Sequence, residues 1–155
     1  MSASANETVV LRAIDAIWNR GDLDVADELF AADYVNHGGL VADLVDGPES
    51  IKFSAAFYRV AFPTLHVTVE EMTTHGNVVR FRWTAAARSV DDPKDESVAA
   101  NQQLLTGITR SRLASGRITE SWTDWDRTAM LHALGVESVQ VVPINARPFG
   151  RRTPP

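Results

Sequence analysis

Acidic and tryptophan side chains alternate near residue 120, and this pattern could carry general acid–base chemistry. Glu120, Trp122, Asp124, Trp125 and Asp126 follow one another closely. A carboxylate in water is a weak base, but burial beside apolar rings raises its pKa and makes it a better proton acceptor. Asp126, with Trp122 and Trp125 as an apolar wall, is therefore a candidate acid/base. It could also cap the helix expected directly after it.

The alternation of a β-strand adds a second carboxylate to this pattern. Side chains two residues apart on a strand point to the same face, so Glu120, Trp122 and Asp124 share one face of the strand expected at 117–125. If Trp122 faces a cavity, Glu120 and Asp124 face it too, unless a bulge intervenes. Asp124 is therefore a rival to Asp126 for the acid/base role.

A histidine and an arginine could stabilise negative charge on a ligand. His37 precedes two glycines, and a neutral imidazole there could donate a hydrogen bond to a negatively charged ligand oxygen. The alternative is a structural histidine bonded to the backbone. Arg82 could bind a ligand carbonyl or carboxylate, or form a salt bridge with a neighbouring carboxylate. Glu120 could pair with Arg82 or with Arg110.

Aromatic and polar residues elsewhere complete the candidate ligand-binding set. Tyr58 could point its hydroxyl into a cavity or pack in the core. Tyr34 and Asn36 lie on the opposite face from His37, where packing or interface contacts are expected. The candidate ligand-binding residues are Trp18, Tyr58, Phe62, Glu120, Trp122 and Asp124.

Several common kinds of site are missing from the sequence. There is no cysteine, which excludes disulfides, thiolate metal sites and cysteine nucleophiles. The histidines lack metal-ligand spacing, so we expect no metal site. Glycine-rich phosphate loops and the Gly-x-Ser-x-Gly elbow of serine hydrolases are also missing, so no cofactor is implied.

Length and charge narrow the class of protein. A chain of 155 residues fits one domain better than two. The net charge of −5 argues against a general nucleic-acid binder. No apolar run reaches the ~18–20 residues of a membrane span, and the first residues do not resemble a signal peptide. We expect a cytoplasmic protein that binds a small apolar molecule and neither nucleic acid nor a membrane.

Three helices are expected before residue 64. Ser4 and Glu7 have capping-box spacing, and Gly21 can end the first helix. Asp22 is a candidate cap for a second helix. The third should begin at Pro48 and stop before Pro63. The apolar residues at helical spacing are Val10, Ile14, Ile17 and Trp18 in the first helix, Val25, Ala26, Leu29 and Phe30 in the second, and Ile51, Ala55, Tyr58 and Phe62 in the third.

After residue 63 the apolar period changes from helical to alternating. Strands are expected at 65–69, 78–90, 102–113 and 117–125, with turns at 76–77 and 115–116. Short connections favour an antiparallel meander, followed by a short helix at 128–134. Helices followed by such a sheet indicate an α+β fold. A strongly curved antiparallel sheet can wrap around the first helix and leave an apolar pocket.

The C-terminal extension forms a separate unit of the prediction. We expect the domain to span 1–135 and the extension to span 136–155. Its segment 139–144 is apolar enough to form an edge strand or to pack on another subunit. The last residues are expected to form a disordered arm.

The sequence resembles the SnoaL-like polyketide cyclases of the nuclear-transport-factor-2-like superfamily over residues 8–135. Four stretches carry the resemblance: Leu-Phe-Ala-Ala-Asp-Tyr-Val-Asn-His at 29–37, Gly-Pro-Glu-Ser-Ile at 47–51 with Ala-Phe-Pro-Thr-Leu at 61–65, Asn-Val-Val-Arg-Phe-Arg-Trp at 77–83, and Ser-Gly-Arg-Ile-Thr-Glu-Ser-Trp-Thr-Asp-Trp-Asp at 115–126 followed by Leu-His-Ala-Leu-Gly at 131–135. The last stretch is the most specific.

The resemblance implies a cone-shaped α+β barrel and a cofactor-free cyclase of the lyase or isomerase type found in antibiotic biosynthesis. Asp126 matches the family's general acid/base for an intramolecular aldol ring closure, with His37 and Arg82 stabilising the enolate. Relatives pair through the open face of the sheet, so a homodimer is expected, with Trp83 or Val79 exposed there.

Three departures from the family leave other functions open. Many relatives have Gly-Thr-His after the arginine strand and Pro-Thr-Gly before the third strand, whereas residues 85–89 and 97–101 differ here. Many also have Pro-Asp where this chain has Pro63 and Thr64. The first alternative is an epoxide hydrolase or epoxide-opening cyclase, which would need two carboxylates bridged by an arginine. The second is a non-catalytic ligand-binding or dimerisation module, because a fold alone does not define a function.

Overall fold

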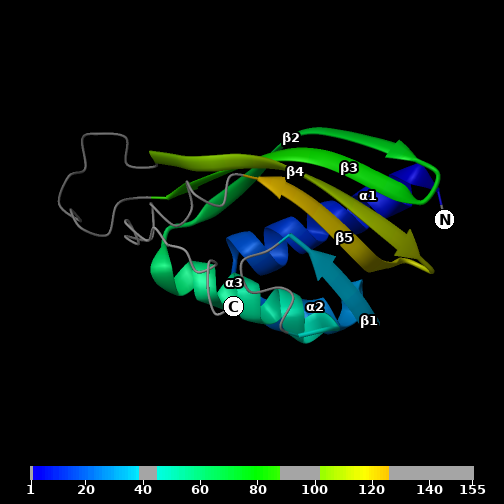
Figure 1. Ribbon diagram of the computed structural model, residues 1–155, viewed down its shortest axis with the longest axis horizontal. Coiled ribbons are helices and arrows are strands. Elements are labelled where there is room, and N and C mark those ends of the chain that lie inside the picture. Colours follow the sequence, from blue (N-terminus) through cyan, green and yellow to red (C-terminus); the bar gives the residue numbers. More distant parts are fainter. Residues whose placement is uncertain (1, 39–44, 88–101, 126–155) are drawn as a thin grey trace, which may run out of the picture.

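A five-stranded curled sheet with helices on its concave side makes up the described part of the chain (Figure 1). The computed structural model describes residues 2–38, 45–87 and 102–125. The elements are α1 (Ala3–Ala13), η1 (Ile14–Asn19), η2 (Leu23–Val25), α2 (Ala26–Leu29), β1 (Phe30–His37), α3 (Pro48–Ala61), β2 (His66–His75), β3 (Val78–Ala87), β4 (Gln102–Ala114) and β5 (Arg117–Trp125). The α+β prediction is confirmed: the sheet curls strongly but stays open.

The first helix begins earlier than the sequence predicts. Ser2 is the N-cap, and its hydroxyl accepts a hydrogen bond of 3.1 Å from the backbone N–H of Ala5. Ser4 lies inside the helix, so the predicted capping box is wrong. After Ala13 the helix widens into the π-helical segment η1, and Gly21 ends it with a φ of +72°.

The second helix is much shorter than expected. Asp22 makes no capping hydrogen bond, and only a 3₁₀ turn and one α-turn precede β1. Phe30 already has extended backbone angles and begins the strand, so its predicted place on the helix is wrong. The segment still buries Ala26 and Leu29, as predicted.

The third helix forms as predicted. Pro48 occupies its first turn, where a missing N–H costs no hydrogen bond. Its predicted buried face is confirmed, since Ile51, Ala55, Tyr58 and Phe62 are all buried. The helix ends at Ala61 because Phe62, which precedes a proline, takes an extended conformation.

The sheet has the strand order β1-β5-β4-β3-β2. The predicted antiparallel meander of β2 to β5 is confirmed, with left-handed residues at Gly76, Ser115 and Gly116 in its turns. However, β1 pairs with β5 in parallel, so the sheet is mixed and not wholly antiparallel. A parallel neighbour requires a long connection, and the chain between β1 and β5 supplies it.

The concave face of the sheet forms the core with α1, η1 and α3. On β3, Val79 is 0 % exposed and Trp83 packs against the same core. Their predicted exposure on the open face is therefore wrong, because both alternate inward with Phe81. The homodimer itself stays a prediction.

No helix in the described ranges is long and apolar enough to cross a membrane. The predicted helix at 128–134, the domain boundary at 135 and the extension at 136–155 lie outside the described residues.

Candidate functional site

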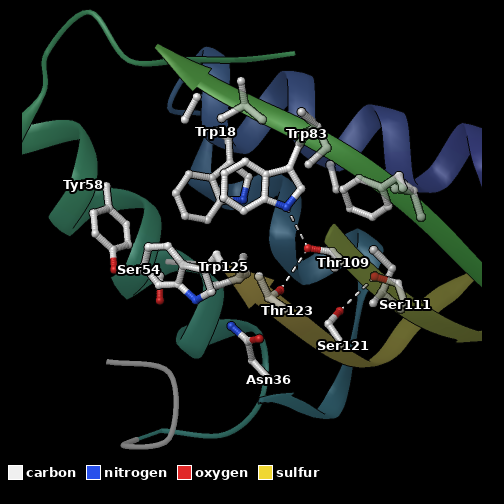
Figure 2. Close-up of a pocket in the computed structure, with 18 of the residues that line it drawn as sticks. Trp18, Asn36, Ser54, Tyr58, Trp83, Thr109, Ser111, Ser121, Thr123 and Trp125 are labelled. Carbon is white, nitrogen blue, oxygen red and sulfur yellow. Dashed lines mark hydrogen bonds between the residues drawn. The ribbon is translucent and has the colours of Figure 1, made fainter. Parts of the chain in front are cut away.

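An apolar cavity of ≈ 160 Å³ lies between the helices and the concave face of the sheet (Figure 2). Its helical walls come from α1, η1 and α3, and its sheet wall comes from all five strands. The lining residues used below are Trp18, Tyr34, Asn36, Tyr58, Phe62, Trp83, Thr109, Ser111, Ser121, Thr123 and Trp125. Among the described residues that line it, none carries a formal charge at neutral pH.

Aromatic rings gather at one end of this cavity. The ring centroids of Trp18 and Tyr58 are 6.0 Å apart, and the Trp125 ring meets Tyr58 edge-on at 6.4 Å. Figure 2 shows Tyr58 reaching in from α3 toward these indoles. Trp18 belongs to η1, and such π-helical turns are frequent at functional sites because they re-aim side chains. This end suits a flat apolar group.

Hydroxyl groups line the floor of the cavity along β4 and β5. The Trp83 indole N–H donates to the Thr109 hydroxyl at 2.9 Å, and Thr109 and Thr123 hydroxyls are 2.9 Å apart. The hydroxyls of Ser111 and Ser121 are also 2.9 Å apart. Figure 2 shows these bonds linking Trp83 on β3 to Thr109 on β4 and Thr123 on β5, and Ser111 on β4 to Ser121 on β5. We call the four hydroxyls of Thr109, Thr123, Ser111 and Ser121 the hydroxyl strip.

A glycine allows the Trp83 ring to reach this strip. Gly107 lies opposite both Trp83 and Trp125 in the sheet register. A Cβ on Gly107 would come within 2.5 Å of the Trp83 ring, which no real contact tolerates. The missing side chain therefore lets the indole lie across β4 and donate to Thr109.

Tyr34 stands at the buried end of the strip. Its residue is 1 % exposed, and burial raises the pKa of its hydroxyl well above the usual range, while a hydrogen bond with Ser121 lowers it by less. Tyr34 therefore stays neutral and acts only as a hydroxyl.

The sequence placed Tyr34 and Asn36 among packing or interface residues, but both line the cavity. Asn36 lies beside Ser121 in the parallel register of β1 and β5. As predicted, Tyr34 and Asn36 share one face of β1 and His37 lies on the opposite face. The face of Tyr34 and Asn36 is the one toward the cavity, whereas the His37 ring stacks on Trp122 on the other side of the sheet.

Three of the predicted ligand-binding residues, Trp18, Tyr58 and Phe62, line the cavity. The predicted location of the other three is wrong. On β4, Leu113 pairs with Ile118 and the next residue in register, Arg112, pairs with Glu120. Thr119 between them has no partner in the register and is an extra residue, a bulge, in β5. Past this bulge, Ser121, Thr123 and Trp125 point into the cavity. Glu120, Trp122 and Asp124 therefore lie on the outer face.

His37 joins these residues on the outer face. Its Nε2 lies 2.8 Å from the Glu120 carboxylate, and its ring stacks on Trp122 at a centroid distance of 5.5 Å. Arg112 reaches the same carboxylate at 3.2 Å, and the guanidinium groups of Arg110 and Arg112 each lie 5.1 Å from the centre of the Trp122 ring. We call this group of five the outer cluster. The expected pairing of Glu120 with Arg82 or Arg110 is wrong, because Arg112 stands directly opposite Glu120.

Arg82 also lies outside the cavity lining. It forms a salt bridge of 3.1 Å with Glu71 on β2, and both side chains are exposed. The structure thus contains the alternative contact foreseen for Arg82, since Phe81 and Trp83 on either side of it point inward.

Asp126 lies outside the described residues, so its predicted role rests on the sequence. It directly follows Trp125, the last lining residue of β5. No cluster of three or more His, Asp or Glu side chains suited to a metal ion occurs in the ranges the structure describes.

The sequence reasoning missed the hydroxyl strip. Thr109 and Ser111 on β4, and Ser121 and Thr123 on β5, alternate at strand spacing. That regular pattern of small hydroxyls was the available signal, but reading it required the bulge that sets which side of β5 faces inward.

Comparisons with known proteins agree on the fold. The profile of the SnoaL-like polyketide cyclase family matches residues 8–134. A search of curated proteins gave no match. Similar solved structures include IdmH from Streptomyces antibioticus, a candidate polyketide cyclase, with 26% identity, a TM-score of 0.65 and coverage of 84% of this chain and 99% of that one.

Two further structures, with lower sequence identity, show the same fold. A candidate polyketide cyclase from Bacillus cereus has 22% identity, a TM-score of 0.70 and coverage of 86% of this chain and 83% of that one. A protein with a ketosteroid isomerase-like fold from Catenulispora acidiphila has 18% identity, a TM-score of 0.63 and coverage of 83% and 92%.

Proposed function

Because the chain belongs to the SnoaL-like polyketide cyclase family, we propose that it closes a ring in a polyketide-like carbonyl substrate held in the concave cavity. The reaction is an intramolecular aldol-type addition without a cofactor. The observation that carries this proposal is the uncharged cavity lining, apolar apart from hydroxyl, amide and indole N–H groups. Such a lining suits a neutral substrate with carbonyl oxygens.

Asp126 is the proposed acid/base. Its carboxylate takes a proton from a carbon between two carbonyl groups, and the resulting enolate carbon attacks a second carbonyl to form the new C–C bond. The alkoxide then takes the proton back from Asp126, so no co-reactant is needed. Apolar surroundings such as Trp125 raise the pKa of a carboxylate and strengthen it as a base.

Epoxide opening receives less support from the geometry. It needs two carboxylates bridged by an arginine, and the sequence offers Glu120, Asp124 and Asp126 for this purpose. Glu120 and Asp124 belong to the outer face of β5, across the sheet from the cavity. A ring closure that uses one carboxylate does not require them.

Proton abstraction can be measured without knowing the natural substrate. We expect the protein to accelerate deuterium exchange at the acidic carbon of 2-tetralone in D₂O, followed by NMR. Asp126→Asn should lower the accelerated rate by at least ~100-fold, since general base catalysis contributes 10²–10⁴-fold. The variant should remain folded and bind the ketone.

Asp124→Asn is the matched control, because it makes the same change two residues earlier on an exposed outer-face position. It should leave the exchange rate unchanged. If Asp126→Asn exchanges at the wild-type rate, Asp126 is not the base. If the wild-type protein binds the ketone but never accelerates exchange, a ligand-binding module explains the chain better.

A further inference from the structure

The hydroxyl strip contains more hydrogen-bond donors than it uses. The first of its two chains joins the Trp83 N–H, the Thr109 hydroxyl and the Thr123 hydroxyl. Three protons are available, and two hydrogen bonds connect the groups. Because an indole N–H can only donate, Thr109 accepts from Trp83, and one threonine proton remains. No other acceptor for it occurs among the described residues.

The second chain gives the same result. Ser111 and Ser121 share one hydrogen bond and hold two hydroxyl protons. Tyr34 also forms a hydrogen bond with Ser121, which adds one hydroxyl proton and one hydrogen bond to this chain. One hydroxyl proton is therefore left without an acceptor whether or not Tyr34 is counted. All these residues line the cavity. A buried donor without a partner is costly, so each chain is poised to donate one bond to a bound molecule.

The spacing of the two chains defines what they could bind. Thr109 and Ser111 are two residues apart on β4, as are Thr123 and Ser121 on β5. Inward neighbours on a strand are ~6.8 Å apart. Two donors at that separation, converging on a flat ligand, match two carbonyl oxygens about 5–7 Å apart, and the para oxygens of a quinone are separated by about 5 Å from standard bond lengths.

We propose that the hydroxyl strip is a dicarbonyl subsite: it selects an uncharged ring or polyketone that presents two carbonyl oxygens about 5–7 Å apart. This inference rests on the proposed function and names the substrate class for the same cavity. The volume of ≈ 160 Å³ is close to the ~150 Å³ of a dry cavity that holds benzene. The ring that bears the carbonyls fills this volume.

Three probes of similar shape test the subsite: naphthalene, 1-tetralone and 1,4-naphthoquinone, with none, one and two carbonyls. We measure their Kd values by calorimetry on the full chain, whose lack of cysteine limits quinone addition. Burial alone favours naphthalene, the most apolar probe. The strip predicts the reverse order, with affinity rising about threefold to tenfold per carbonyl.

The double variant Thr109→Val/Thr123→Val removes both hydroxyls of the first chain at nearly constant volume and leaves only the indole N–H of Trp83. It should weaken naphthoquinone binding about tenfold and leave naphthalene binding unchanged. Thr84→Val is the matched control, because Thr84 lies on the outer face of the same sheet, and it should behave like the wild-type protein. The wild-type probe series needs no variant, so it stands even if the double variant does not fold.

The proposal is overturned if naphthalene binds as tightly as naphthoquinone, if none of the probes binds, or if the double variant weakens both ligands equally. Probe binding does not use Asp126. If the protein prefers carbonyl probes but does not accelerate deuterium exchange, the cyclase proposal fails and the dicarbonyl subsite stands. If it accelerates exchange but shows no carbonyl preference, the subsite fails and the cyclase proposal stands.

Discussion

The two faces of one sheet differ sharply in charge. The concave face of β3, β4 and β5 presents tryptophans, small apolar groups and the hydroxyl strip to the cavity. The outer face of the same strands carries Arg80, Arg82, Arg110 and Arg112, together with Glu120 and Asp124. His37 does meet a carboxylate, that of Glu120, but the two side chains meet on the face away from the cavity.

The difference follows from the cost of burying charge. A carboxylate in the cavity wall would have to give up its hydration or its charge, whereas a hydroxyl needs only one partner. The bulge at Thr119 assigns Ser121 and Thr123 to the inside and Glu120 and Trp122 to the outside. The proposed function takes its charged group from Asp126, which follows the last residue of β5 in the sequence.

The strongest way to break this comparison is to place a charge on the concave face. Val79→Asp puts a carboxylate at a position that is 0 % exposed. It should lower the free energy of unfolding by more than about 4 kcal/mol, because a buried side chain is lost and an unpaired charge is buried. Arg80→Asp, one residue later on the exposed face, should change it by no more than about 0.5 kcal/mol. Urea unfolding measures both, and similar losses for the two variants would contradict the assignment of faces.

A smaller effect concerns the buried tyrosine hydroxyl. Tyr34→Phe should cost about 0.5–1.5 kcal/mol at neutral pH through the lost hydrogen bond with Ser121. Because burial raises the pKa of Tyr34 in the folded state, the unfolded state ionises first, near pH 10. Above about pH 10 the free energy of unfolding of the wild-type protein should therefore fall as pH rises. The Tyr34→Phe variant lacks this hydroxyl, so its free energy of unfolding should fall less over the same range. Denaturant titrations between neutral pH and pH 11 test this; parallel curves for the two proteins would mean that Tyr34 is not protected.

The smallest effect is expected in the outer cluster. Glu120→Gln removes the charge that His37 and Arg112 contact. These side chains are partly exposed, so the loss of stability should stay below about 1 kcal/mol. Binding of naphthoquinone should not change. A clear fall in its affinity would place Glu120 in the ligand site and remove the distinction between the faces.

The sequence predicted the fold where local signals were strong. Pro48 and Pro63 bounded α3, and Gly76 and Gly116 marked the turns of the meander, because each residue constrains its own backbone. The parallel pairing of β1 with β5 could not be read in the same way. It joins segments more than 80 residues apart, and nothing local in either strand specifies it.

The candidate site was predicted less completely, for a related reason. Trp18, Tyr58 and Phe62 follow from helical periodicity, and all three line the cavity. On β5 the inference assumed that side chains alternate strictly between the two faces of the sheet. The extra residue Thr119 exchanges the faces for every residue after it. Bulges leave no dependable local signature, so the strip of hydroxyls became visible only with the sheet register.

The location of a bound ligand tests the central claim most directly. With methyl-labelled protein and 1-tetralone, intermolecular NOEs should connect the ligand to the methyl groups of Ala85, Thr109 and Thr123, which line the cavity. The methyl groups of Thr106 and Ile108 lie on the other face of β4 and should show none. NOEs to Ile108 or Thr106 in place of the cavity methyls would contradict the account, because they would move ligand binding to the outer face beside Trp122 and His37.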